Sequence, residues 1–260
     1  MNNNPIGVYD SGFGGLSVWR ELHRALPCES LIYLGDGKNC PYGSQSAERI
    51  RVLAEASVRE LVERGCKMVV VACNTATAAA ISHLRATFDI PIVGLEPAVK
   101  PACAMTRSKI IGVIATHRSL QGEKFLSTVE RYGQGVEVIK AVGEGFVEAV
   151  EQNAEREPET AELVRSVVEP IIERGADVIV LGCTHYPFLR DVISKVVGER
   201  DVAIIDSGAA VERRVESLLD EYGLRAAEDN NPNLEFITFA DEQYRKSLQA
   251  KAFDGIESLK

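Results

Sequence analysis

The sequence of 260 residues lacks several features that would place it in a membrane, outside the cell or on nucleic acid. It has no apolar run long enough to span a bilayer. Its first residues, MNNNPIGVYDSG, lack the basic region, apolar stretch and small-residue cleavage site of a secretory signal. Its formal net charge of −9 lacks the positive excess that non-specific nucleic-acid binding requires. These absences predict a cytoplasmic protein with no membrane or nucleic-acid partner.

The six cysteines lack the spacing of a disulfide or zinc framework, because no CxxC pair is present. In a cytoplasmic protein we expect them to be free thiols. Four of them stand beside a proline, at the start of a strand or within a predicted helix, and we assign these four structural roles: Cys28, Cys40, Cys66 and Cys103.

Short apolar runs alternate with longer stretches of helical periodicity along the whole chain. Runs of this length, separated by helices, are typical of parallel strands that are covered on both faces. The fold class is therefore predicted to be α/β, with strands at 6–9, 31–34, 68–72, 110–115, 177–182 and 202–206 and a short strand near EFITFA at 235–240.

An internal repeat is the most informative feature of the sequence. Residues 63–73, ERGCKMVVVAC, align without gaps on residues 173–183, ERGADVIVLGC, at an offset of 110 positions (63 to 173, 73 to 183). Each copy ends a helix, continues through a buried strand and presents a cysteine, Cys73 or Cys183, at the carboxyl end of that strand. Ligands bind at this edge in open α/β sheets. A second similarity pairs VYDSG with IIDSG at 204–208.

The two repeats favour two related α/β halves with an active site in the cleft between them. The proline-rich stretch at 91–101 is a natural crossover from one half to the other, and the chain can return near Asp206. We therefore expect a discontinuous first domain, 1–97 plus 207–260, and a second domain, 98–206.

The paired cysteines indicate acid–base chemistry. A cysteine after an apolar strand is by itself more often an ordinary core residue, but matching positions in two repeats reverse those odds. Backbone donors at a helix N-terminus can lower a thiol pKa from about 8.5, which makes the thiol a usable base. Two such groups suit racemisation, because one removes a proton from a carbon while the other delivers a proton to the opposite face.

His185 follows Cys183 by two residues in CTHYP. A Cys-x-His spacing also occurs in metal sites and in hydrolase pairs, but no second cluster of ligands accompanies it in the sequence. We therefore predict no metal and favour a proton-handling or orienting role for His185 beside Cys183.

Two glycine-containing loops are candidates for binding a small anion. The first, DSGFGGLS, follows a strand that ends at Asp10, but it lacks the last glycine of GxGxxG and no P-loop lysine follows. The second, GDGKNCPYGS, offers hydroxyl and backbone donors from Tyr42, Gly43 and Ser44. With little general positive field, such an anion must be held by local donors of this kind. A purely structural turn is the alternative for both loops.

Taken together, these motifs resemble the glutamate racemase family: DSGFGGLSV, GD with PYGS after it, ACNTATA, GVIAT and LGCTHYP occur in that order, and DSG follows at 206–208. The resemblance implies an isomerase with two pseudo-symmetric α/β domains that uses two cysteines and neither pyridoxal phosphate nor metal. It also implies a homodimer that supplies D-glutamate for peptidoglycan, and so a role in cell-wall biogenesis and cell shape.

The resemblance also implies roles for individual residues. Cys73 would serve D-glutamate and Cys183 L-glutamate, with Asp10 and His185 as auxiliary groups and Glu151 as an acidic partner. Substrate contacts would come from Asp10, Ser11, Tyr42, Gly43, Ser44, Asn74, Thr75, Thr116, Ser119, Thr184 and His185.

The chain departs from the usual family pattern in two stretches. Ser119, Gly122 and Phe125 stand where Thr, Ser and Tyr are common, and the segment 142–151 lacks a frequent Cys-Pro pair. These departures bear on the roles of Ser119 and Glu151.

Three other functions fit part of the pattern. One is a racemase of the same two-cysteine type that acts on aspartate or another amino acid. Another is a hydrolase that uses Cys183 and His185, although this leaves Cys73 and the repeat unexplained. The third is a noncatalytic protein that binds an amino acid between two α/β lobes.

Overall fold

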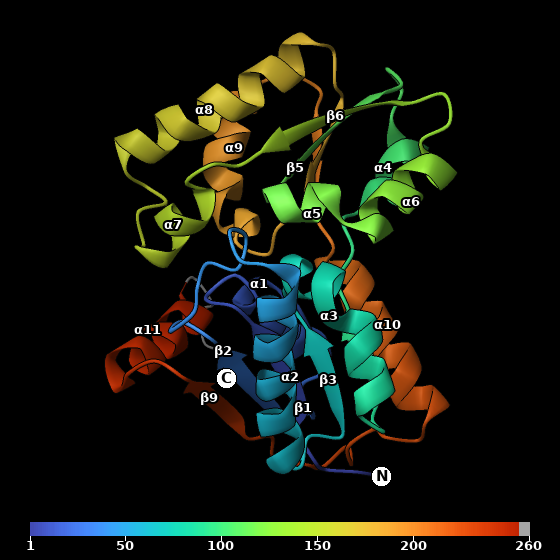
Figure 1. The fold of residues 1–260 in the computed structure, drawn as a ribbon, viewed down its shortest axis with the longest axis vertical. Coiled ribbons are helices and arrows are strands. Elements are labelled where there is room, and N and C mark those ends of the chain that lie inside the picture. Colours follow the sequence, from blue (N-terminus) through green and yellow to red (C-terminus); the bar gives the residue numbers. More distant parts are fainter. Residues whose placement is uncertain (255–260) are drawn as a thin grey trace. The chain divides into compact units, whose positions relative to one another are not determined.

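The computed structural model describes residues 1–254, and the chain divides into two compact units. The first unit contains residues 1–95 and the described residues from 208 onward, and the second contains residues 96–207. Each unit has its own parallel sheet flanked by helices, which confirms the α/β prediction (Figure 1). Within the described residues, no helix is both long enough and apolar enough to cross a membrane.

The sheet of the first unit has five parallel strands in the order β4-β3-β1-β2-β9. The first three strands along the chain are buried at every position, because helices cover both faces of the sheet. The strands are β1 (Ile6–Asp10), β2 (Leu31–Gly35), β3 (Met68–Val71), β4 (Ile92–Gly94) and β9 (Leu234–Thr238).

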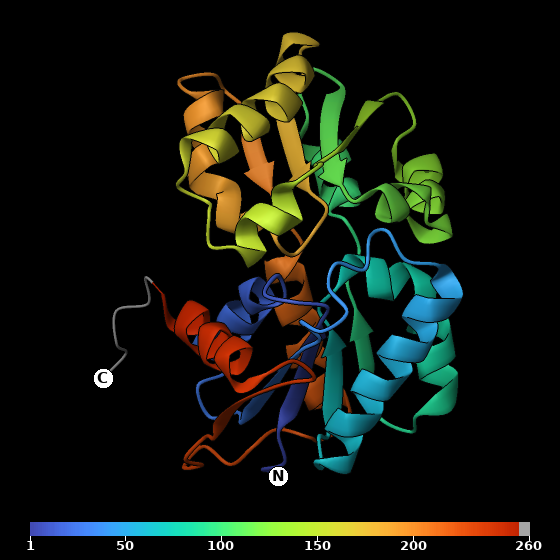
Figure 2. The same cartoon turned by 60° about the vertical axis from the view of Figure 1, so that its left-hand side comes forward.

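Five helices cover this sheet, two on one face and three on the other (Figure 2). Helices α2 (Ala47–Glu63) and α3 (Asn74–Thr87) share one face and pack together. The opposite face carries α1 (Leu16–Ala25), α10 (Gly208–Glu221) and α11 (Glu242–Phe253).

The sheet of the second unit has four parallel strands in the order β6-β5-β7-β8. They are β5 (Ile110–Ala115), β6 (Glu137–Val142), β7 (Val178–Leu181) and β8 (Ala203–Ile205). The helical elements are α4 (Val99–Met105), α5 (His117–Gln121), α6 (Glu123–Tyr132), α7 (Phe146–Glu151), α8 (Pro158–Glu173), the 3-10 helix η1 (Tyr186–Leu189) and α9 (Arg190–Val197).

Alternating side chains of β5 face the two helical layers of the second unit. Ile111 and Val113 join a cluster with α4, α5 and α6. On the other face, a Cβ atom at Gly112 would lie 2.3 Å from a side-chain carbon of Ile171 in α8, so the glycine permits this close approach. β5 therefore contributes to two apolar layers.

The predicted strands all occur, but the sequence missed two others. β4 lies inside the proline-rich stretch that we interpreted as a crossover, and three residues are too few to show a periodicity. β6 is an edge strand with only one buried residue, and Lys140 interrupts its apolar residues, so it has no continuous apolar run.

The repeat containing the two cysteines occupies equivalent positions in the two sheets. The order β4-β3-β1-β2 matches β8-β7-β5-β6, so β3 and β7 are counterparts. The second similarity has no such equivalence, because Asp10 ends β1 whereas Asp206 follows β8 at a sheet edge. The topological counterpart of β1 is β5. The Asp-Ser-Gly match is therefore not a second structural repeat.

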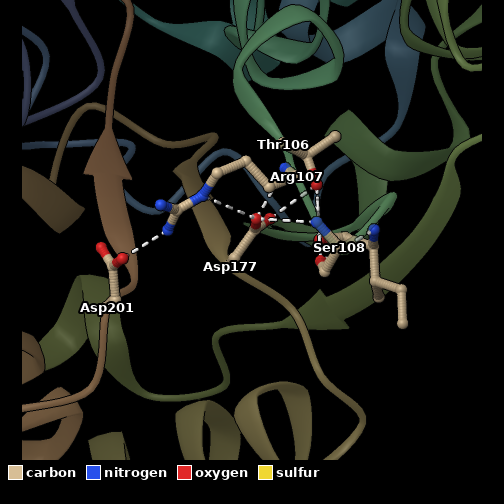
Figure 3. Close-up of polar contacts among 6 residues, drawn as sticks. Thr106, Arg107, Ser108, Asp177 and Asp201 are labelled. Carbon is tan, nitrogen blue, oxygen red and sulfur yellow. Dashed lines mark hydrogen bonds and ion pairs between the residues drawn. The ribbon is translucent and has the colours of Figure 1, made fainter.

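The residue before β7, Asp177, is hydrogen-bonded to the segment that follows α4 (Figure 3). The Asp177 carboxylate accepts hydrogen bonds from the Thr106 hydroxyl at 2.6 Å and from the backbone N–H groups of Arg107 and Ser108 at 2.7 and 2.9 Å. Burial alone would raise the pKa of this carboxyl, but the hydrogen bonds outweigh burial and lower the pKa to about 2. Arg107 also forms an ion pair with Asp201.

Candidate active site

Cys73 is the residue that connects β3 to α3 in the first unit. Its backbone is extended, and it serves as the N-cap of α3, with Sγ accepting a hydrogen bond from the backbone N–H of Ala76 at 3.4 Å. The side chain is 5% exposed. A helix N-terminus that donates to a sulfur favours negative charge on it, so this position suits a thiol that must act as a base.

The loop after β1 lies against Cys73. Asp10 is fully buried, and its Oδ1 accepts from the backbone N–H of Gly12 at 2.8 Å. The hydroxyl of Ser11 lies 3.7 Å from Sγ of Cys73, which donates to it. The Tyr33 hydroxyl donates to the Gly12 carbonyl at 2.6 Å, and this hydrogen bond holds the turn in place. The sequence-predicted residues Asp10, Ser11 and Cys73 therefore occupy one edge of the first sheet.

The Tyr42 side chain has a different role from the one that its sequence context suggested. Its hydroxyl donates to Oδ2 of Asp36 at 2.6 Å and accepts from the hydroxyl of Tyr9 at 2.9 Å. Burial, followed by the neighbouring Tyr9 and Asp36, raises the pKa of Tyr42 far above its usual range. Because a hydroxyl has only one proton, the side chain that we predicted as a ligand donor gives that proton to Asp36. The donors that Tyr42 and Gly43 can still offer to a ligand are their backbone N–H groups.

Asp36 is a buried acid that the sequence reasoning did not select. Besides the Tyr42 hydroxyl, it accepts from Nδ2 of Asn39 at 2.9 and 3.0 Å. A signal was present, because Asp36 follows Gly35, the register partner of Asp10, and so stands at the same carboxyl edge. We assigned this stretch to a loop by composition alone. Ser44, which we grouped with Tyr42, has an exposed side chain.

Asn74 and Thr75 open helix α3 directly after Cys73. Both side chains are buried, at 6% and 4% exposure. The Oδ1 atom of Asn74 is enclosed and accepts no hydrogen bond from the residues that the structure describes. Buried polar atoms nearly always have partners, so this amide has hydrogen-bonding capacity that a ligand can use.

Cys183 occupies the corresponding place in the second unit, two residues after β7. It is buried, and Nδ1 of His185 lies 3.8 Å from its sulfur. Nε2 of the same imidazole lies 2.6 Å from Oε1 of Glu151, the last residue of α7. The structure thus places Cys183, His185 and Glu151 in one chain of contacts, although Glu151 is 32 residues away from Cys183 in the sequence.

The other predicted residues of the second unit also lie at the carboxyl edge of its sheet. Thr116 follows β5 and caps α5, accepting from the backbone N–H of Ser119 at 3.2 Å and donating to its hydroxyl at 2.9 Å. Thr184 is buried beside Cys183. Burial, and next to it the Cys183 sulfur, raises the pKa of Tyr186 well above its usual value, so this phenol remains protonated. The thiol of Cys183 therefore lies close to the hydroxyl-bearing residues Thr184 and Tyr186 and to the imidazole of His185.

Comparisons with known proteins show the family to which the chain belongs. The sequence profile of the family described as Asp/Glu/Hydantoin racemase matches residues 6–215. The chain is 46% identical over 246 residues to the glutamate racemase of Deinococcus radiodurans, covering 94% of this chain and 84% of that protein.

Two solved structures have the same fold. A glutamate racemase isoform from Bacillus anthracis superimposes with a TM-score of 0.85 at 32% identity, covering 98% of this chain and 95% of that one. The Escherichia coli glutamate racemase in complex with L-glutamate and the activator UDP-MurNAc-Ala gives a TM-score of 0.82 at 32% identity, covering 95% of each chain.

Proposed function

Because the chain belongs to the Asp/Glu/Hydantoin racemase family, we propose that it is an isomerase that interconverts L- and D-glutamate by a two-base mechanism without a cofactor. The observation that carries the proposal is the equivalence of two buried thiols. Cys73 lies two residues after β3, and Cys183 lies two residues after its counterpart strand, β7. Each thiol therefore stands at the carboxyl edge of its own sheet, where ligands bind in open α/β sheets.

The reaction needs one base and one acid at the substrate α-carbon. The thiolate of one cysteine removes the α-proton and becomes a thiol, while the thiol of the other cysteine donates its proton to the opposite face and becomes a thiolate. The electron pair of the broken C–H bond is held as a carbanion delocalised into the α-carboxylate until the second proton arrives. By family resemblance, Cys73 abstracts from D-glutamate and Cys183 from L-glutamate.

The neighbours of each thiol have auxiliary roles in this mechanism. His185, in contact with both Cys183 and Glu151, assists proton transfer at Cys183. Asp10 lies in the same loop as Ser11, which contacts Cys73, and it assists proton transfer on that side.

The proposed substrate contacts lie in the segments that follow the carboxyl ends of the strands, and most of them are buried, whereas Ser44 is exposed. The enclosed Oδ1 of Asn74 is an acceptor that suits the ammonium group of the substrate, and the backbone N–H of Gly43 suits a carboxylate. The remaining proposed contacts are Ser11, Tyr42, Ser44, Thr75, Thr116, Ser119, Thr184 and His185. Such neutral donors can hold an anionic substrate without a strong net positive field.

The alternatives differ in what they leave unexplained. A hydrolase based on Cys183 and His185 gives Cys73 no role, and a noncatalytic binding protein needs neither thiol. An aspartate racemase would use the same two thiols. Glutamate is favoured over aspartate because a glutamate racemase is 46% identical over most of this chain and because the similar Escherichia coli enzyme binds L-glutamate.

The decisive experiment follows α-hydrogen exchange and racemisation of L- and D-glutamate in deuterated water, with no added cofactor, and uses L- and D-aspartate in parallel. We expect the wild type to exchange and racemise glutamate and both Cys73→Ala and Cys183→Ala to lose racemisation. Exchange with aspartate alone would move the assignment to that substrate. Binding of glutamate without exchange would support the noncatalytic protein, and a trapped acyl group on Cys183 would support the hydrolase.

In the cell, this reaction would supply D-glutamate for peptidoglycan. We propose that it takes place in the cytoplasm and that the enzyme is a homodimer, both from the family resemblance. Light scattering on the purified protein over a range of concentrations tests the second point.

A further inference from the structure

Helix α11, the last helix described, contacts a loop that contains residues of the candidate site. The ring of Tyr244 stacks on the ring of Phe13, with centroids 4.9 Å apart and planes 19° apart. Phe13 lies in the turn between Asp10 and α1 and is 2% exposed. Stacked rings at this distance are an attractive contact, so Tyr244 holds one side of the turn that includes Ser11.

The same ring lies against the second loop of the first unit. A Cβ atom at Gly37 would be 2.3 Å from two ring carbons of Tyr244, so the ring covers the backbone at this glycine. One turn later in α11, Leu248 lies 3.1 Å from the position of a Cβ atom at Gly35. Gly35 and Gly37 begin the loop that leads to Tyr42 and Gly43. Tyr244 is therefore a shared contact of both loops.

Helix α11 is well anchored, so it can hold these loops in place. At its start, the Asp241 side chain accepts from the backbone N–H of Tyr244 at 2.9 Å. At its end, Arg20 of α1 donates to the carbonyls of Ala252 and Asp254 at 3.0 and 2.9 Å. The buried ammonium of Lys251 also lies 5.5 Å from the centre of the Phe13 ring.

We propose that Tyr244 is a positioning residue for the substrate: its ring holds the loop that contains Ser11 and the loop that contains Gly43 in one arrangement. The inference rests on the proposed function, because it assigns these loops to glutamate binding. Groups that bind a small ligand must be held in place before it arrives, and loops are the most mobile part of such a site. A ring shared by two loops reduces the independent motion of each.

The test compares three variants of α11. Tyr244→Ala removes the ring, Tyr244→Phe keeps it, and Phe253→Ala removes a ring of the same helix that contacts Trp19 and Phe236 instead of the loops. We expect Tyr244→Ala to raise KM for both enantiomers about tenfold with a smaller change in kcat, because the binding groups are less well placed. Tyr244→Phe and Phe253→Ala should keep a KM near that of the wild type.

Hydrogen exchange gives a readout that does not depend on activity. Peptides covering 11–15 and 36–44 should exchange faster in Tyr244→Ala than in either control, while peptides of β1 and β3 should be unchanged. A wild type without glutamate racemisation would refute the proposed function, yet the exchange data would still report whether Tyr244 orders the loops. Unchanged exchange and KM in Tyr244→Ala, or a Tyr244→Phe variant as impaired as the alanine variant, would overturn the positioning role of the ring.

A double-variant cycle adds a check on the second loop. Gly37→Ala introduces a Cβ atom that must displace the Tyr244 ring, so it should raise KM in the wild-type background. In the Tyr244→Ala background, the same substitution should have little further effect. Equal effects of Gly37→Ala in both backgrounds would show that the ring and the glycine act independently and would contradict the proposal.

Discussion

Nε2 of His185 and Oε1 of Glu151 lie 2.6 Å apart, which gives the imidazole a defined orientation. When Nε2–H donates to the carboxylate, Nδ1 presents its lone pair to the Cys183 sulfur at 3.8 Å. A neutral ring in this tautomer can accept the thiol proton. The carboxylate then stabilises the positive charge that develops on the ring. We therefore propose that Glu151 acts on Cys183 through His185.

Replacing Glu151 by Gln tests this relay. Glutamine keeps an acceptor for Nε2–H but lacks the charge that favours the protonated ring, so we expect kcat to fall about tenfold while folding is retained. Glu148→Gln is the matched control, since Glu148 is an exposed residue of the same helix. Steady-state kinetics on both enantiomers measure the effect. Equal activity of the two variants would remove Glu151 from the mechanism.

Tyr42→Phe separates a structural from a binding role of the phenol. Because the hydroxyl donates to Asp36, we expect the free energy of unfolding of the variant to fall by about 1–2 kcal/mol. We expect its KM to change by less than about threefold. Tyr222→Phe, at an exposed phenol of the same unit, should change neither. Urea unfolding and kinetics give the two quantities. A large rise in KM without loss of stability would mean that the hydroxyl binds substrate.

Asp177→Asn should destabilise the second unit in a pH-dependent way. The folded-state pKa of about 2 is below the ordinary value of 3.8, so the ionised form stabilises the fold above about pH 4, and this contribution disappears as the pH falls toward 2. The shift corresponds to about 2 kcal/mol near neutral pH. The difference in unfolding free energy between wild type and variant should therefore shrink as the pH is lowered from 7 to 3.

Asp201→Asn is the control for this measurement. Asp201 pairs with Arg107 in the same cluster, but its side chain is 84% exposed, and exposed ion pairs contribute little. We expect a small difference from wild type that does not vary strongly between pH 7 and 3. A constant difference for Asp177→Asn as well would show that its hydrogen bonds do not depend on the charge.

Lys67→Met should strongly destabilise the first unit. Lys67 and Glu29 form an ion pair at 2.5 Å with side chains 1% and 4% exposed, and Glu29 also accepts from the backbone N–H of Ala226. Removing the lysine leaves a buried carboxylate without its cation, for which the expected loss is about 3–5 kcal/mol. The double variant Lys67→Met/Glu29→Leu should recover part of it.

A surface pair provides the comparison for Lys67→Met. Arg24→Met removes the cation of the exposed pair with Glu21 and should cost less than about 1 kcal/mol. Urea unfolding of all these variants at one pH gives the ranking. Similar losses for Lys67→Met and Arg24→Met would mean that the buried pair is not a major contributor.

Most of the strands and the two thiols were predictable because short sequence patterns mark them. A buried parallel strand is a continuous apolar run, and the offset of 110 residues placed Cys73 and Cys183 on counterpart strands. Glu151 could be predicted only from the family resemblance, because its contact with His185 depends on how α7 packs in the second unit.

Other parts of the candidate site were not predictable from the sequence. The Tyr42 hydroxyl and Asp36 are six residues apart, but which partner the hydroxyl selects depends on the path of the loop. Tyr244 lies more than 200 positions after Phe13 and Gly37, and no motif around it indicates a contact with either residue. Contacts of this range follow from the tertiary fold and leave no local pattern.

The two thiols have unlike neighbours, a hydroxyl and a helix N-terminus at Cys73 and an imidazole at Cys183. In water, however, enantiomers have equal free energies, so the equilibrium constant of the proposed reaction is unity for every variant. Thermodynamics then requires kcat/KM to be the same in both directions. A substitution beside one thiol can redistribute kcat and KM between the directions, but it must change kcat/KM by the same factor in both directions. It can never make the enzyme produce one enantiomer in excess at equilibrium.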